Sequence, residues 1–162
     1  REEFGHWEVD LVLGKKTKNE PVIITMVERK TRYCLTKKVW GKGAALVQKG
    51  VLDLMKKQGL EQFKPLTPDN GSEFSSLSLI ESIAEDVQVF FTHAYASWEK
   101  GTNERHNRML REFIPKGVTL RPLSYSYLLE VTDTINHRPR KIMGYTTPAE
   151  RLQEELADLQ AA

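Results

Sequence analysis

The feature that most constrains the fold of this chain is a change in hydrophobic period near residue 41. Before it, residues 6–13 alternate between apolar and polar side chains, residues 21–28 are rich in β-branched residues, and residues 33–40 form a third segment of this kind. The links between them, GKKTKNEP and RKTR, contain turn-forming residues. We therefore predict three consecutive antiparallel strands in a meander.

Beyond residue 41 the pattern alternates between helical and strand periods. Apolar residues recur at helical spacing up to Gly59, and short apolar runs follow at residues 63–67 and 87–92. The tetrapeptide Thr147-Pro148-Ala149-Glu150 predicts a capping box with proline at the first helical position. We expect further helices over residues 75–86 and 125–136. The resulting order, β-β-β-α-β-α-β-α-α-α, predicts an α/β domain with a mixed five-stranded sheet, three antiparallel strands followed by two more, flanked by helices.

Residues 98–117, with the sequence WEKGTNERHNRMLREFIPKG, predict the central helix of the chain. Thr102 or Asn103 is a suitable N-cap, and Pro115 and Gly117 end the helix. One face of this helix carries polar residues and the opposite face carries a core stripe, because positions three and four apart share a face. The polar face comprises Glu104, Asn107, Arg108 and Arg111, and the stripe Met109, Leu110, Phe113 and Ile114. An acid followed by arginines suits a metal-dependent site that acts on phosphates.

Composition limits the class of protein. The 162 residues, 40% of them apolar, suffice for one domain with a substantial core. The sequence contains no signal peptide and no apolar run of about eighteen residues, which predicts that it does not span a membrane. Because Cys34 is the single cysteine, an internal disulfide and a multi-cysteine metal cluster are excluded, and a reducing cytoplasm is expected. The chain begins with Arg1 and not with methionine, so we expect a fragment of a longer protein.

The charge distribution is more informative than the net charge. The formal net charge of +2 is too small to indicate a nucleic-acid partner. From Lys100 to Arg121, however, six basic residues accompany two acids. Such a basic face is compatible with a phosphate backbone. A solvated helix face is the alternative that charge alone favours.

Three acids are candidates for a functional site. Asp10 lies within a predicted strand on the face opposite the apolar one, Asp69 directly follows a strand, and Glu104 begins the central helix. Three carboxylates brought together would repel each other unless cations lay between them, and oxygen ligands suit Mg²⁺ or Mn²⁺. Taken singly, each acid has a simpler interpretation: a surface position in a strand, a tight Asp-Asn-Gly turn, and a favourable charge at a helix N-terminus. The segment DNGSE lacks the acidic end position of a calcium loop.

Four motifs surround these acids, and together they carry a family resemblance. They are GHWEVDLVLGKK, TPDNGSEF, WEKGTNERHNRMLREFIPKG and NHRPRKIMGYTTPAE. In this order they resemble the catalytic core of DDE transposases in the retroviral-integrase superfamily, most closely the bacterial transposases of the insertion-sequence-30 type. The resemblance extends from about Gly5 to Arg151, and 34 residues (70–103) separate Asp69 from Glu104. It implies an RNase H-like fold, a single catalytic core domain over residues 1–162, and Asp10, Asp69 and Glu104 as a triad that holds two divalent ions.

The resemblance also implies a reaction and its partners. A core of this family cleaves DNA at transposon ends with water and joins the resulting 3′-hydroxyl to target DNA, using two Mg²⁺ or Mn²⁺ ions. It implies a homo-oligomer assembled on DNA, and a cytoplasmic bacterial protein that is nucleoid-associated when bound to DNA. The chain departs from the family pattern P-Y-x-P-W-Q-R-G-x-N-E-N at Ala94, Glu99, Lys100 and Arg105. These departures bear on DNA contacts and leave the three acids in place. We do not expect residues 1–162 to include the family's N-terminal helix-turn-helix region.

Several basic residues are candidates for DNA contact. Guanidinium groups match phosphate oxygens, so we assign Arg108 and Arg111 to the DNA backbone, with helix solubility as the alternative. Lys100, Arg105 and Arg138 are further candidates. For Arg138, with its neighbours Arg140 and Lys141, plain surface charge is an equal alternative.

Other polar residues receive lesser roles. His106 points toward the apolar side of its helix, which predicts a packed histidine and no ligand role. Glu8 shares a strand face with Asp10 but stands roughly 7 Å away along the strand, so we do not expect it to join the same ligand set. Glu73 is expected at a helix N-terminus. His93 could contact DNA or a metal, and Trp98 could stack on a base or anchor its loop.

Two rival functions remain open at this point. One is an RNase H-like nuclease that cuts without joining, and the other is a non-catalytic DNA-binding module. Two segments of the quoted motifs outside the triad, PKG and RPRK…TPAE, favour a transposase over the nuclease. The presence of all three acids argues against a module that has lost catalysis.

Overall fold

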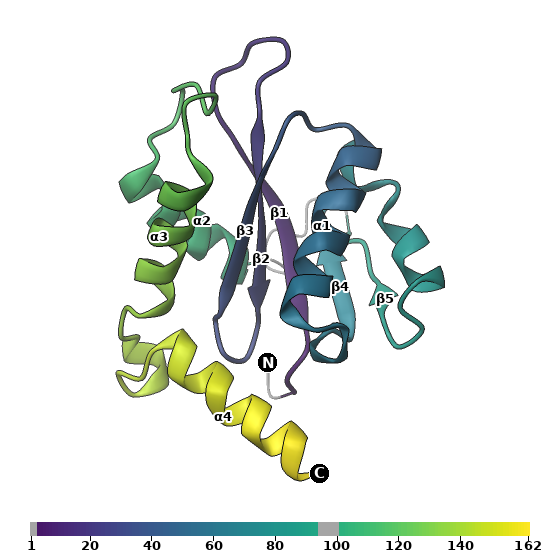
Figure 1. The fold of residues 1–162 in the computed structure, drawn as a ribbon, viewed down its shortest axis with the longest axis vertical. Coiled ribbons are helices and arrows are strands. Elements are labelled where there is room, and N and C mark those ends of the chain that lie inside the picture. The colour runs from purple at the N-terminus through teal and green to yellow at the C-terminus, as the bar shows by residue number, and fades with distance from the viewer. Residues whose placement is uncertain (1–2, 94–100) are drawn as a thin grey trace.

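The computed structural model describes residues 3–93 and 101–162 and contains the mixed sheet that the sequence predicts (Figure 1). Its strand order is β3-β2-β1-β4-β5. The strands are β1 (Trp7–Leu13), β2 (Val22–Glu28), β3 (Cys34–Val39), β4 (Pro65–Pro68) and β5 (Gln88–Val89). The first three pair antiparallel, as the meander requires, and β4 pairs parallel to both β1 and β5.

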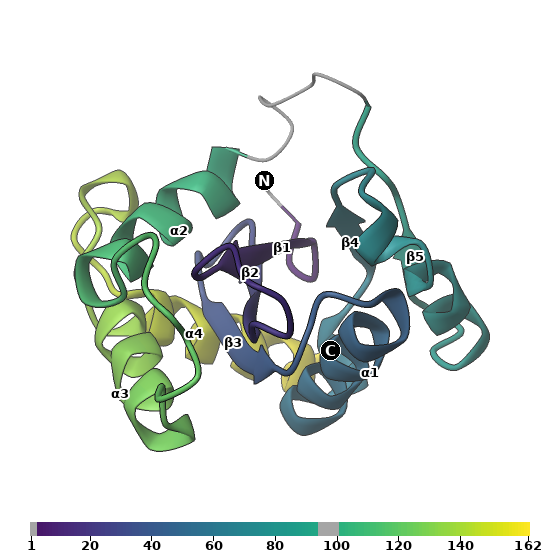
Figure 2. The same ribbon diagram turned by 90° about the horizontal axis from the view of Figure 1, so that it is seen from above.

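Helices cover both faces of the sheet. They are α1 (Ala44–Gln58), α2 (Gly101–Phe113), α3 (Tyr125–Asn136) and α4 (Pro148–Ala161). Figure 2 shows α1 on one side of the sheet and α2 and α3 on the other, while α4 lies across the end of the sheet near the β2–β3 turn. An ion pair of 2.6 Å between Lys30 and Glu155 joins that turn to α4. The domain is therefore a three-layer arrangement closed at one end by its last helix.

Strand β2 shows why two separate cores form. All seven of its residues are buried, so its side chains point alternately into the core under α1 and into the core under α2 and α3. Ile24 belongs to the first core, together with Val9, Val51 and Met55. Ile23 belongs to the second, which also contains Val12, Met109, Leu110, Ile114, Leu128, Val131 and Ile135. The apolar stripe predicted for the central helix is thus confirmed as the surface by which α2 packs.

Three local predictions are wrong. Residues 75–86 do not form an α-helix but contain a 3₁₀ segment, Leu77–Ser82, because Leu77 and Ile80 reach the core at the three-residue spacing that a 3₁₀ helix provides. Strand β5 is confined to Gln88–Val89. Helix α2 already includes Gly101, so neither Thr102 nor Asn103 is its N-cap, and both side chains are buried in the domain.

The second face of β1 is also covered, contrary to the amphipathic pattern of its sequence. Helix α2 packs over it, so Val12 is buried and Glu8 is only 1% exposed. Further 3₁₀ segments in the described part of the chain lie at Leu60–Gln62, Ser72–Phe74 and Lys141–Met143. The capping box of α4 is confirmed, since Thr147 Oγ1 accepts from the Glu150 amide and Glu150 Oε2 from the Thr147 amide. Across the described ranges, no helix has the length and apolar character needed to cross a bilayer.

Candidate active site

Parallel pairing of β1 with β4 brings Asp10 and Asp69 to neighbouring positions. In this register Val9 of β1 lies opposite Pro68 of β4. Asp10 and Asp69 are the residues that directly follow these two in the sequence. Adjacent strands run about 4.7–4.9 Å apart. Both side chains are partly exposed, and Asp69 directly follows the end of β4, where Thr92 Oγ1 donates to its Oδ1 at 3.5 Å. The two carboxylates therefore occupy neighbouring positions in the interior of the sheet, with Asp69 at the carboxyl end of β4.

Helix α2 is fixed above Asp10 by Asn107. Its Nδ2 donates to Asp10 Oδ2 at 2.8 Å, and its Oδ1 accepts from Thr25 Oγ1 at 3.2 Å. The other oxygen of Asp10, Oδ1, accepts from the backbone N–H of Leu11 at 2.9 Å. These contacts orient the carboxylate of Asp10. The sequence pattern puts Asn107 on the face of Glu104 but does not reveal its contact with Asp10, and its spacing of three residues from Glu104 was the available signal.

Glu104 lies in the first turn of α2, one turn before Asn107, with a side chain that is 71% exposed. Its Oε1 is 3.6 Å from Nη2 of Arg108, one turn further along the helix. Among the described residues, no three His, Cys, Asp or Glu side chains stand close enough together to hold one metal ion. The structure thus puts Asp10 and Asp69 at neighbouring positions of adjacent strands and sets the face of α2 that carries Glu104 and Asn107 against Asp10, while the carboxylate of Glu104 lies beside Arg108.

The two arginines assigned to DNA differ in their surroundings. Arg108 extends into solvent, with a side chain that is 79% exposed. Arg111 is partly buried, which lowers the pKa of its guanidinium, and its Nη2 donates to the Leu13 carbonyl at 2.7 Å. It thereby fastens the end of α2 to the end of β1. Arg108 is the one of the two whose side chain is directed outward.

The remaining basic candidates gather on another side of α2. Arg138 pairs with Glu112 at 3.0 Å and lies over the ring of Phe113. Arg105 lines a shallow depression together with the segment Arg138–Ile142. Lys100 and Trp98 fall outside the described residues, as do Ala94 and Glu99. His93 is exposed.

His106 and Glu8, which the sequence analysis does not expect to be metal ligands, are hydrogen-bonded to groups outside the proposed ligand set. His106 is 3% exposed, and burial lowers the pKa of its imidazole to about 4, so the ring is neutral at pH 7. Its two ring nitrogens lie 2.9 Å from the Thr102 carbonyl and 2.8 Å from the Arg32 carbonyl, which confirms a packed histidine. Glu8 is bound to Arg29 and to the backbone of α2, away from the ligand set. Glu73 lies in the first turn of the Ser72–Phe74 segment.

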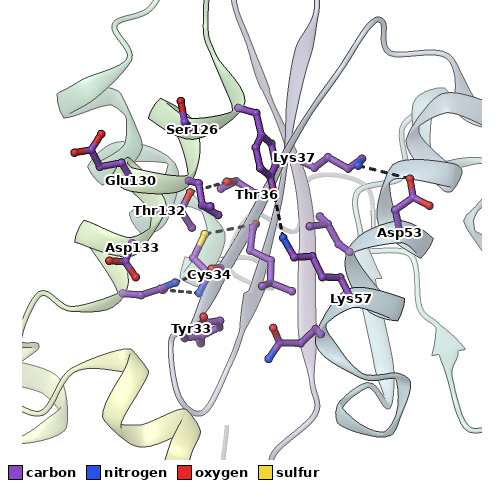
Figure 3. Close-up of a pocket in the computed structure, with 16 residues that line it drawn as sticks. Tyr33, Cys34, Thr36, Lys37, Asp53, Lys57, Ser126, Glu130, Thr132 and Asp133 are labelled. Carbon is purple, nitrogen blue, oxygen red and sulfur yellow. Dashed lines mark hydrogen bonds and ion pairs between the residues drawn. The ribbon is translucent and has the colours of Figure 1, made fainter.

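A hollow of about 630 Å³ lies between β3, α1 and α3 (Figure 3). Thr36 of β3 shares a hydrogen bond of 2.6 Å with Thr132 of α3, and Lys37 is 3.6 Å from Asp53 of α1. Cys34 also lines this hollow, but burial raises the pKa of its thiol to about 12, so it is not a nucleophile at neutral pH. The strand order separates the hollow from the two carboxylates, because β2 lies between β3 and β1, the strand that carries Asp10.

Comparison with known proteins identifies relatives of this chain. Residues 1–108 match the family described as "Integrase core domain". The chain is 53% identical over 145 residues to the "Probable transposase for insertion-like sequence element IS1161" of Streptococcus salivarius, covering 90% of this chain and 40% of that protein. It is 34% identical over 157 residues to the "Transposase InsI for insertion sequence element IS30A" of Escherichia coli (strain K12), covering 97% of this chain and 40% of that protein.

The fold has a counterpart among solved structures. The catalytic core domain of BIV integrase superposes with a TM-score of 0.70 at 19% sequence identity, covering 97% of this chain and 99% of that one. This likeness confirms the RNase H-like fold expected from the sequence. The chain spans about two fifths of the length of the curated relatives it matches.

Proposed function

Because residues 1–108 match the integrase core, this chain belongs to the integrase core domain family, and we propose that it is the catalytic core of a DNA transposase of the insertion-sequence type. The observation that carries the proposal is that Asp10 and Asp69 directly follow the paired residues Val9 and Pro68, with the Glu104 face of α2 tied to Asp10 through Asn107. Residues 1–162 act in this proposal as a single catalytic domain. The proposed class of enzyme is a polynucleotidyl transferase.

The proposed reaction is phosphoryl transfer on DNA in two stages. Hydrolysis at a transposon end exposes a 3′-hydroxyl, and this hydroxyl then displaces the leaving oxygen of a phosphodiester in target DNA. Such a reaction requires positioning and charge neutralisation and no covalent enzyme intermediate. Since an element has two ends, we propose that the complete protein acts as a homo-oligomer assembled on DNA in the bacterial cytoplasm.

Asp10, Asp69 and Glu104 are the proposed metal ligands. Their donor atoms are all carboxylate oxygens, which suit a hard divalent cation. Two ions of Mg²⁺ or Mn²⁺ bound there would supply the Lewis acidity that an in-line displacement at phosphorus requires. Asn107 keeps Asp10 in one orientation, and Arg108 balances the charge of Glu104 at the rim of the site.

The proposed DNA contacts are phosphate contacts. Arg108 is the strongest candidate because its exposed guanidinium stands beside Glu104. Arg105 and Arg138 would contact DNA further along the protein surface, and Lys100 and Arg111 complete the proposed set. None of these contacts selects a base sequence, because phosphate contacts position a duplex without reading it.

Calorimetric titration of Mn²⁺ into the chain bound to a pre-cut duplex tests the metal site. We expect Asp69→Asn to lose most of the binding, because it removes one charged ligand. Asp53→Asn, which changes an exposed carboxylate on α1, is the matched control and should bind like the unchanged protein. Equal binding by all three proteins would refute the assignment of the acids and favour a non-catalytic module.

A joining assay distinguishes the transposase from a nuclease. The substrate is a duplex with an exposed 3′-hydroxyl at the element end, mixed with a target plasmid. A transposase core joins the two, whereas a nuclease of the same fold cuts DNA without forming the joined product.

A further inference from the structure

A buried polar cluster lies beneath the first turn of α2, and the proposed reaction does not use it. Its centre is the carboxylate of Glu8, which is 1% exposed. Oε1 accepts from Nε of Arg29 at 2.9 Å, and Oε2 accepts from the backbone N–H of Asn103 at 2.8 Å. Burying a carboxylate is strongly unfavourable unless it is paired and hydrogen-bonded. Both oxygens of Glu8 therefore have a defined partner.

The contact with Asn103 joins the two elements that carry the candidate ligands. Glu8 stands two residues before Asp10 on β1, and Asn103 immediately precedes Glu104 on α2. Backbone N–H groups in the first turn of a helix lack acceptors within the helix, and the helix dipole favours a negative charge there. The carboxylate of Glu8 on the neighbouring strand thus accepts a hydrogen bond from one of these backbone N–H groups, at the residue next to Glu104.

The β2–β3 turn supports this contact from the other side. The buried carboxylate of Glu28 accepts from the backbone N–H groups of Lys30 at 2.9 Å and of Thr31 at 2.6 Å, which sets the conformation of the turn. From this turn Arg29 reaches Glu8, and Arg32 donates to Thr102 Oγ1 at 2.5 Å.

The same turn contacts α2 a second time. The Arg32 carbonyl lies 2.8 Å from Nε2 of His106. The turn and β1 together therefore hold α2 at Thr102, Asn103 and His106, on both sides of Glu104 in sequence. The side chain of Glu104 is mostly exposed, so its position follows from the backbone that these contacts hold.

We propose that Glu8 is a positioning residue, which holds the first turn of α2 against β1 so that Glu104 stays above Asp10 and Asp69. Glu8 does not bind the metal, because both of its oxygens are engaged by Arg29 and Asn103. The consequence for metal binding rests on the function proposed above. The mechanical part, that Glu8 orders the first turn of α2, does not depend on it.

Glu8→Gln is the informative variant, because glutamine keeps the size of the side chain but has one acceptor oxygen for two donors. The bond to a charged guanidinium is the stronger of the two, so the remaining oxygen stays with Arg29 and the contact with Asn103 is lost. Glu8→Ala removes both contacts and serves as a second variant. Glu155→Gln is the matched control, because it breaks the ion pair between α4 and Lys30 of the same turn.

Two measurements are made on each variant. Amide hydrogen exchange over residues 101–107 should become about tenfold faster or more in Glu8→Gln, as expected when a hydrogen bond to a charged group is lost, with residues 125–136 of α3 unchanged. Mn²⁺ affinity in the presence of a pre-cut duplex should fall about 10–100-fold, the usual effect of removing a partner that orients metal ligands. The control should change neither quantity.

The outcomes separate this proposal from the proposed function. Unchanged amide hydrogen exchange over residues 101–107 in both Glu8 variants overturns the positioning role, whatever the measured Mn²⁺ affinity is. Faster exchange with unchanged Mn²⁺ affinity also overturns it, provided that Asp69→Asn abolishes binding. If Asp69→Asn binds Mn²⁺ normally, the metal site itself is refuted, and faster exchange still supports Glu8 as the residue that orders α2.

Discussion

His106 shows at the scale of one residue how burial sets chemistry in this domain. It sits on α2 between the active-site face and the core stripe, yet its imidazole is enclosed and neutral. Burial is the main cause of the lowered pKa, and it outweighs the two carbonyl contacts, which favour the protonated ring. A histidine two residues from Glu104 is therefore part of the packing and not a proton carrier.

The lowered pKa predicts a pH dependence of stability. The folded state has a pKa of about 4 at His106, whereas the unfolded chain keeps the ordinary value of about 6.5. Between these values the unfolded state binds more protons, so the free energy of unfolding falls as the pH drops through this window, by up to about 3 kcal/mol. Urea unfolding of the protein and of His106→Gln at several pH values between 4 and 7.5 measures this change in the free energy of unfolding.

The comparison isolates His106 because both proteins share every other titrating group. We expect the difference between their unfolding free energies to narrow as the pH falls. Parallel curves would show that His106 titrates in the folded state as it does in the unfolded chain.

At the scale of the element, the two ends of α2 have different roles: the C-terminal part packs against the core, and the N-terminal turn carries a candidate ligand. Its C-terminal part packs through Met109 and Leu110 and is tied to β1 by Arg111. Its N-terminal turn carries Glu104, with Arg108 directed into solvent one turn on. Arginines on one helix face can thus serve different purposes, depending on which carbonyls or solvent they meet.

This difference predicts separable effects on DNA binding and stability. Arg108→Ala should weaken binding to a DNA duplex and reduce the slope of log K against log salt by about 0.9, because one phosphate contact is lost. Its melting temperature should stay unchanged, since the side chain is exposed. Arg111→Lys keeps the charge but loses the fork that holds the Leu13 carbonyl, so it should lower the free energy of unfolding by about 1 kcal/mol.

Fluorescence anisotropy at several salt concentrations and thermal unfolding measure the two effects. A salt slope that stays the same in Arg108→Ala would exclude this residue from the phosphate contacts. An unchanged stability of Arg111→Lys would mean that its bond to Leu13 contributes nothing measurable.

At the scale of the whole molecule, the sheet separates two cores, and only one of them lies under α2, the helix that carries Glu104. Ile23 and Ile24 are adjacent on β2 and equally buried, but they face opposite sides. The core of Ile23 lies under α2, which carries Glu104 and Asn107. The core of Ile24 lies under α1, which carries no candidate ligand.

These neighbours form a matched pair of variants. Ile23→Ala and Ile24→Ala should each lower the free energy of unfolding by about 2–5 kcal/mol, because each leaves a cavity. Only Ile23→Ala should also weaken Mn²⁺ binding on DNA, since its cavity loosens the support of α2. Denaturant unfolding and the calorimetric titration test both statements, and equal losses of Mn²⁺ affinity would contradict the separation of the two cores.

Local patterns in the sequence were enough for most elements. The strand character of β1, the apolar run of β2, the stripe of α2 and the capping box at Thr147 each depend on residues within a few positions of one another. These predictions are confirmed because periodicity and capping act over that range. The helix expected at residues 75–86 is wrong for the complementary reason. Its conformation depends on how Leu77 and Ile80 reach a core built by distant strands.

The sequence by itself therefore determined the order of the strands and helices apart from residues 75–86, the family, and which three acids to consider. Only the tertiary structure decided what surrounds those acids. The carboxylate of Asp10 is hydrogen-bonded to the side chain of Asn107, 97 positions away in the sequence. The carboxylate of Glu8 is hydrogen-bonded to the backbone N–H of Asn103, 95 positions away. Such contacts arise when strand pairing and helix packing bring distant segments together, and the composition of neither segment specifies its partner. That is why Glu8, whose alternating pattern predicts an exposed face, is instead buried against the helix that carries Glu104.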